Sequence, residues 1–501
     1  MLIRLALIAV SVLILARPAA AAELSPAEVA ALAPVLAQAE AHGLAEPGDG
    51  ALRARLASPD AAVRAAAAAP LRERVLAYAA AQRSGRVPPA SVDRRWAFRP
   101  ATFDAARAFE EARAAGRLSA WLAELPPPHP GYRALLAVRA RYAAHVASGG
   151  WPRLTDEAAL AEGKSGEAVA RLRARLAAEG YASADPEATQ FGPSLAAAVK
   201  AFQATHGLAV DGVVGPATRQ ALNVSAAERL RQIDLSLERW RWLPRPLPAR
   251  RLEVNVAGAE AALIDGGAPA LRMRLVVGAA ASKTPLFAST IHSVVFNPPW
   301  NVPTSIARNE ILPKAARDPG YLARNRYRWV GGQLQQAPGP GNSLGRVKLD
   351  FDNPFGVYLH DTPSKAAFAR PQRTLSHGCM RMEKPREMVA LLLAPQGWSA
   401  AQVDKAIEAG STQRVRLAQP TPVFVTYQTA WVDADGRVIF VPDVYGWDAA
   451  WPPRWTAAPR WPRWSRSSRS NAHWWPGKVD QGQGWRWRIG ACWTSTPRAE
   501  P

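Results

Sequence analysis

The hydrophobic periodicity of this chain changes once, near residue 250, and this change constrains the fold more than any other feature. From residue 23 to about 245, apolar residues recur at the spacing of amphipathic helices. Beyond it, Arg251–Val256, Leu271–Val277 and Thr290–Phe296 are short, rich in Val and Ile, and typical of strands. We therefore predict a multidomain α+β protein in which helical domains precede a mostly β domain.

The first 22 residues have the pattern of a secretory signal. Arg4 supplies a positive start, Leu5–Ala16 is an apolar run too short to span a bilayer comfortably, and Ala20-Ala21-Ala22 offers small residues for cleavage. We predict a signal peptide over residues 1–22. An uncleaved anchor is the alternative, and no later stretch is long and apolar enough for a transmembrane helix.

The formal net charge of +21 restricts the class of partner. An exported chain rarely meets nucleic acid, so we expect none, and an acidic polymer such as cell wall or an anionic membrane face suits the charge better. A coding bias towards Arg and Ala would raise the charge without any function, and the sequence leaves that alternative open. With only two cysteines, Cys379 and Cys492, the chain has no disulfide framework.

The helical part divides into three predicted units. Residues 23–160 are rich in Ala, Arg, Leu and Glu and are expected to form a helical scaffold domain. Residues 161–225 form a compact unit in which Ala198–Gln203 and Gly207–Thr218 resemble the three-helix peptidoglycan-binding module. A small helical spacer is the alternative for this unit. Residues 226–249 are predicted to be a connecting helix.

The β domain is expected to span residues 250–448. Val423–Val432 and Arg437–Val441 alternate and flank Asp433-Ala434-Asp435-Gly436, which is a strong hairpin signal. An irregular stretch holds a predicted insertion at about 301–346, and long loops inside compact domains are commonly lids or binding loops.

Residues 449–501 are rich in Trp, Arg and Pro without periodicity, and we expect no fold there. Weak contact with a membrane surface or anionic glycans, or out-of-frame translation, would each account for this tail.

One short motif carries the chemistry. Cys379 follows Gly378, and His360 and His377 lie within twenty residues of it. A thiol attacks only as thiolate, so it needs a base nearby. We predict Cys379 as nucleophile and His360, at the end of a short strand, as base. His377 is the alternative base, because in an extended chain it would point to the same side as Cys379. Gly378 would let backbone amides approach an oxyanion.

The pattern of His360 followed by Ser376-His377-Gly378-Cys379 resembles the active-site signature of the L,D-transpeptidases, and in particular the large Gram-negative YcbB type. That type also carries a helical scaffold, a peptidoglycan-binding module and a capping insertion. The resemblance extends over further segments, which are Asn297–Asn309, Gly339–Gly345, Tyr358–Lys365 and Thr426–Tyr445. It implies a β-sandwich with the cysteine in a groove.

The resemblance also implies roles for individual residues. Tyr358 and the amides around Gly378 and Cys379 would line the oxyanion site. Arg381 stands where many shorter relatives have Asn, but the large type tolerates Arg there. The residues assigned to substrate binding are Trp300, Asn301, Ser376 and Arg381. No metal or organic cofactor is expected, since no Cys-x-x-Cys or His pair supports four ligands.

The implied reaction forms 3→3 cross-links in peptidoglycan. The thiolate attacks the third residue of a tetrapeptide stem, D-Ala leaves, and a second stem's amine resolves the thioester; carbapenems would acylate the same thiol. Alternatives are L,D-carboxypeptidase activity, transfer of the stem to a lipoprotein, and a non-catalytic wall-binding scaffold. We expect a periplasmic monomer whose partners are peptidoglycan stem peptides and glycan.

Overall fold

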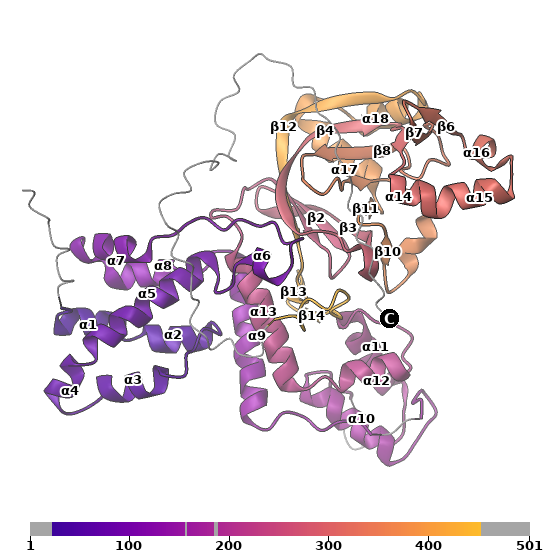
Figure 1. The fold of residues 1–501 in the computed structure, drawn as a ribbon. Coiled ribbons are helices and arrows are strands. Elements are labelled where there is room, and N and C mark those ends of the chain that lie inside the picture. The colour runs from indigo at the N-terminus through magenta and orange to yellow at the C-terminus, as the bar shows by residue number, and fades with distance from the viewer. Residues whose placement is uncertain (1–22, 156–157, 185–188, 452–501) are drawn as a thin grey trace, which may run out of the picture. The chain divides into compact units, whose positions relative to one another are not determined.

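The computed structural model describes residues 23–155, 158–184 and 189–451 of the chain. The predicted signal peptide therefore lies outside the described residues, as does the predicted tail beyond residue 451. Described residues up to 241 form helices, and those after 250 form a β-rich structure with a few helices (Figure 1). The predicted multidomain α+β architecture is confirmed.

The N-terminal region packs short helices around an apolar core that includes Leu32, Val75 and Phe109. A buried ion pair reinforces it, because Arg74 Nε lies 2.6 Å from Asp49 Oδ1 and both side chains are nearly inaccessible to solvent. The helices of this region are α1 (Pro26–Leu32), α2 (Val35–Ala41), α3 (Asp49–Leu56), α4 (Ala61–Ala65), α5 (Ala68–Ser84), α6 (Pro89–Val92), α7 (Ala105–Ala114), α8 (Leu118–Glu124) and α9 (Pro130–Ala147).

The predicted three-helix module is confirmed as α10 (Glu167–Ala178), α11 (Pro193–Thr205) and α12 (Pro216–Leu222). Its core includes Leu172, Val199 and Phe202. The buried amide of Gln203 fixes the loop between α11 and α12, since its Nε2 donates to Asp211 Oδ1 at 2.7 Å and to Val213 O at 3.0 Å. The connecting helix is α13 (Ala226–Arg241).

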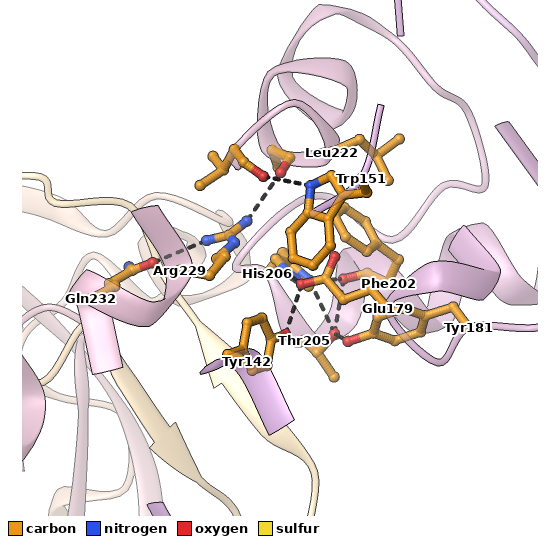
Figure 2. A network of polar contacts seen from close by, with 12 residues as sticks. Tyr142, Trp151, Glu179, Tyr181, Phe202, Thr205, His206, Leu222, Arg229 and Gln232 are labelled. Carbon is orange, nitrogen blue, oxygen red and sulfur yellow. Dashed lines mark hydrogen bonds and ion pairs between the residues drawn. The ribbon is translucent and has the colours of Figure 1, made fainter. Parts of the chain in front are cut away.

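A buried polar network joins this module to α9 and α13 (Figure 2). Tyr142 on α9 donates to Glu179 Oε1 at 2.7 Å, and Arg229 on α13 donates to Ala221 O at 3.0 Å. His206 packs against Phe202, and burial lowers the pKa of its imidazole. These contacts attach the module to the helices on both sides of it in the sequence.

The β-rich domain is built on one nine-stranded sheet with the order β10-β3-β11-β9-β8-β4-β12-β1-β2. The strands are β1 (Arg251–Asn255), β2 (Glu260–Asp265), β3 (Ala268–Gly278), β4 (Phe287–Phe296), β8 (Val347–Phe351), β9 (Leu359–His360), β10 (Thr374–Ser376), β11 (Met380–Met382) and β12 (Gln413–Thr426). Helices α17 (Pro385–Leu393) and α18 (Ala400–Glu408) add to the same apolar core.

The sheet closes on itself, so the β-sandwich implied by the family resemblance is wrong. β3 pairs with β2 along its first half and with β11 and β10 near its end. The long strand β12 shifts register between Arg416 and Thr421, a bulge of the kind that bends a strand and increases its twist. The result is a single barrel-like sheet around a shared core.

The predicted hairpin is confirmed as β13 (Ala430–Val432) paired with β14 (Val438–Phe440). It is a separate two-stranded sheet, because the chain leaves β12 at Thr426. Its buried residues pack against helices rather than against the closed sheet, with Phe440 contacting Tyr142.

The insertion forms a small subdomain of its own, here called the cap (residues 300–336). It contains a three-stranded sheet of order β5-β7-β6 with helices beside it (Figure 1). Its elements are β5 (Trp300–Asn301), α14 (Thr304–Ile306), a π-helix (Ala307–Ile311), α15 (Leu312–Arg317), α16 (Tyr321–Arg324), β6 (Tyr327–Val330) and β7 (Gln333–Gln336).

The packed structure extends past residue 448, where the sequence composition changes. Trp451 is 2% exposed and lies against Trp96 and Trp242, with ring centroids 5.9 and 5.7 Å away. None of the helices among the described residues combines the length and apolar composition that crossing a bilayer requires.

We predict that Trp451→Ala destabilises the protein by about 3–5 kcal/mol, because it removes a fully buried indole and leaves a cavity. Trp329→Ala is the matched control: Trp329 is 58% exposed on the cap, so its loss should change stability by less than about 0.5 kcal/mol. Denaturant unfolding followed by circular dichroism measures both. Equal stabilities for the two variants would contradict the packing of Trp451.

Candidate catalytic site

Parallel pairing of two short strands brings the predicted site residues together. β9 and β11 align Leu359 with Met380 and His360 with Arg381. Leu359 and Met380 are buried in the core of the closed sheet. Because side chains alternate along a strand, His360 and Arg381 lie on the opposite face of this pair, as do the preceding residues Tyr358 and Cys379.

The loop that carries Cys379 is held by hydrogen bonds within it. Gly378 adopts φ 115°, a conformation that favours glycine. Its N–H donates to Ser376 Oγ at 3.1 Å, and the Ser376 hydroxyl donates to Cys379 O at 2.6 Å. Ser376 therefore shapes the loop, and the Gly378 N–H is already engaged within it.

A second set of residues fixes this loop from outside, and sequence reasoning missed it. Thr284 Oγ1 donates to Gly378 O at 2.8 Å and accepts from Gly278 N–H at 2.9 Å. Tyr445 donates its hydroxyl proton to Gly278 O at 2.6 Å. A Cβ on Gly278 would lie 2.1 Å from Ser282 O. No motif marks these residues, because they lie far from Cys379 in the sequence.

The thiol of Cys379 is half-buried and unpaired. Burial raises the pKa of the thiol, while the backbone N–H and the hydroxyl of Tyr358 and the charges of Lys348 and Arg381 act in the opposite direction. The net effect is upward, so the resting group is a neutral thiol and its proton must leave when it attacks.

His360 is buried beside this thiol's strand, and burial, with a smaller effect from Arg381, lowers the pKa of its imidazole to about 4. The carbonyls of Asp361 and Leu344 act in the opposite direction. Nδ1 lies 2.5 Å from Asp361 O and must be the protonated nitrogen of the neutral ring, so Nε2 is left as proton acceptor. At neutral pH the ring is therefore uncharged, and Nε2 is its proton-accepting atom.

Tyr358 connects the thiol to the cap. Its hydroxyl faces Cys379 and accepts a hydrogen bond from the indole of Trp300, and burial raises the pKa of the phenol. The rings of Tyr358 and His360 meet edge to face at 5.6 Å, and Lys348 Nζ lies 4.5 Å from the Tyr358 ring centroid. Cys379, Tyr358, His360, Arg381 and Trp300 thus belong to one site.

The remaining predicted residues lie elsewhere. The backbone at Gly378 is not extended, so the reason for placing His377 on the side of Cys379 does not hold. His377 is half-exposed, and its Nε2 lies 2.6 Å from Glu310 Oε1 on the cap. Asn301 is exposed and accepts from Gln335 at 2.8 Å within the cap sheet. No group of three metal-ligating side chains occurs among the described residues.

Comparison with known protein families identifies three regions. Residues 249–432 match the model of the L,D-transpeptidase catalytic domain, residues 165–222 that of a "Putative peptidoglycan binding domain", and residues 22–138 that of a scaffold domain.

Two curated proteins are similar to parts of the chain. A "Putative L,D-transpeptidase" of Haemophilus influenzae is 31% identical over 216 residues, which are 39% of this chain and 44% of that protein. The zinc D-Ala-D-Ala carboxypeptidase of Streptomyces albus G is 50% identical over 62 residues, 12% of this chain and 24% of that protein. The chain thus spans less than half the length of either relative.

Solved L,D-transpeptidase structures are also found. That of Stackebrandtia nassauensis is 16% identical and covers 55% of this chain and 96% of its own, with a TM-score of 0.24. The structure from Xylanimonas cellulosilytica is 16% identical, and the match covers 55% of this chain and 98% of that chain, with a TM-score of 0.20. These TM-scores are too low for the likeness to support a conclusion about this chain.

The geometry predicts how Cys379 reacts with iodoacetamide. In a Cys492→Ser background, the alkylation rate should rise with pH through a midpoint above the ordinary cysteine value of about 8.5. Tyr358→Phe should move this midpoint up by about one pH unit, because the lost hydroxyl stabilises the thiolate. Intact mass against time at each pH gives the rates. A downward shift, or none, would contradict the contact between Tyr358 and the thiol.

Proposed function

The chain belongs to the L,D-transpeptidase family, and from this premise we propose that it forms 3→3 cross-links in peptidoglycan through a thioester on Cys379. The observation that carries the proposal is the pairing of β9 with β11, which puts a nucleophile, a neutral imidazole and a hydroxyl on one face. Acyl transfer by a thiol needs a nucleophile, a base and a donor to the oxyanion.

The first half-reaction acylates the enzyme. His360 Nε2 accepts the thiol proton while Cys379 Sγ attacks the carbonyl of the third, diamino-acid residue of a tetrapeptide stem. The Tyr358 hydroxyl and the Cys379 N–H serve as oxyanion donors, and among described contacts that N–H has no other acceptor. Collapse of the intermediate releases D-Ala, whose amine takes the proton from His360.

Arg381 is suited to hold the donor stem. Its half-buried guanidinium has no ion pair among the described residues, and its charge acts on Cys379 and His360. A planar guanidinium binds a carboxylate through two hydrogen bonds. We assign it the terminal carboxylate of the stem. Trp300 lies over Tyr358 and would exclude water from the acyl-enzyme.

The second half-reaction decides between related activities. A second stem's side-chain amine gives a cross-link, water gives L,D-carboxypeptidase activity, and a protein amine would anchor a lipoprotein. The peptidoglycan-binding module favours wall stems as acceptors. The large charge of +21 suits work on an acidic wall in the periplasm.

In a Cys492→Ser background, we predict that a carbapenem adds one molecule to the otherwise wild-type protein, with no adduct on Cys379→Ala, because Cys379 is then the one thiol of the chain. His360→Ala should slow the adduct by about 10²–10⁴-fold, the usual contribution of a general base. His292→Ala, in the same domain but on β4, should react at the wild-type rate. Intact mass against time measures all four proteins.

Cross-linking itself is tested with disaccharide tetrapeptides. Wild-type protein should give dimers whose linkage joins two third residues, identified by fragmentation in the mass spectrometer, and Cys379→Ala should give none. Folded wild-type protein that binds peptidoglycan but forms neither adduct nor dimer would overturn the proposal in favour of a non-catalytic scaffold.

A further inference from the structure

An acidic residue of the cap reaches the loop that carries the nucleophile. Glu310 lies in the π-helix of the cap, and its Oε1 is 2.6 Å from His377 Nε2. The two side chains are 43% and 50% exposed, so both are open to solvent. His377 is two residues from Cys379, which places their Cα atoms within about 7 Å of each other. π-helical turns are rare and occur often at functional sites.

The second half-reaction has an electrostatic problem that this residue would solve. The acceptor amine resembles a lysine, whose pKa is about 10.4, so it arrives as an ammonium ion. Two cationic side chains, Lys348 and Arg381, already act on Cys379. An approaching ammonium therefore needs a carboxylate near the thioester to offset their repulsion.

The other carboxylates near the site are already paired with cations. Asp361 lies 2.6 Å from Lys365 Nζ and accepts from the Arg346 N–H. Asp350 lies 2.8 Å from Lys348 Nζ and also pairs with Arg414. The partner of Glu310 is the imidazole of His377 rather than a lysine or an arginine. Glu310 thus keeps its negative charge available to a cationic ligand.

We propose that Glu310 binds the ammonium group of the acceptor stem and that His377, through its Nε2–H, holds the Glu310 carboxylate in place. This inference rests on the proposed function. The ammonium gives one proton to water, and the amine then attacks the thioester carbonyl. The new C–N bond forms and the C–S bond breaks. The amine's second proton passes through His360 to the departing Cys379 thiolate.

The test follows the fate of one acyl-enzyme pool, so that it does not depend on how fast each variant acylates. Protein acylated by a tetrapeptide donor is mixed with a large excess of a tripeptide acceptor, and cross-linked and hydrolysed products are counted by mass spectrometry. Glu310→Gln should lower the ratio of cross-link to hydrolysis by about tenfold, because it removes a charge-assisted hydrogen bond to the ammonium. His377→Ala removes the donor that holds the Glu310 carboxylate and should lower the same ratio.

Two controls separate charge recognition from a loosened cap. Hydroxylamine is uncharged at neutral pH, so its yield relative to hydrolysis should be the same in Glu310→Gln as in wild type. Glu387→Gln removes an exposed carboxylate from α17 of the same domain and should leave both ratios unchanged.

An unchanged ratio of cross-link to hydrolysis in Glu310→Gln would overturn the inference. An equal fall in the ratio of hydroxylamine product to hydrolysis would also overturn it, because it would indicate that water enters a loosened cap. Failure of the wild-type protein to form any acyl-enzyme is a different result: it would overturn the proposed function, and this inference with it.

Discussion

The parallel register of β9 against β11 is the constraint on which the site depends. Strand β11 is three residues long and β9 is two, yet their pairing sets both Cys379 and His360 on one face. A shift of one residue would turn Cys379 or His360 into the core, because side chains alternate. The buried side chains of Leu359 and Met380 oppose such a shift, since it would bring them to the surface.

Burial at this site also sets the charge states of His360 and Cys379. Burial keeps His360 neutral and raises the pKa of Cys379, so the resting pair carries no charge. In the proposed mechanism charge would separate only when the thiol attacks, and Tyr358, Lys348 and Arg381 each favour the thiolate that would form. The loop can hold this geometry because Thr284 and Tyr445 fix it from the opposite side.

In the proposed reaction, the cap and the peptidoglycan-binding module would contact the substrate without taking part in breaking or forming its peptide bonds. The cap contacts the site twice, through Trp300 at Tyr358 and through Glu310 at His377. The first contact is made to the tyrosine whose hydroxyl faces the thiol, and the second places a carboxylate beside the loop that carries Cys379. The peptidoglycan-binding module is attached to α9 and α13 by buried polar contacts, which favours it as a fixed part of the enzyme.

The sequence by itself determined the order of helical and β-rich parts and the module, and it supplied the residues proposed for the chemistry, because periodicity and the Ser376–Cys379 motif are local properties. It led us to expect a β-sandwich, since closure depends on β3 pairing with β2 and with β11, which no local pattern records. Thr284, Tyr445 and Glu310 were missed for the same reason: each reaches the loop across a large separation in sequence. Tertiary structure alone decided which side chains meet Cys379, because contacts between distant segments arise only when the sheet closes and the cap packs over it.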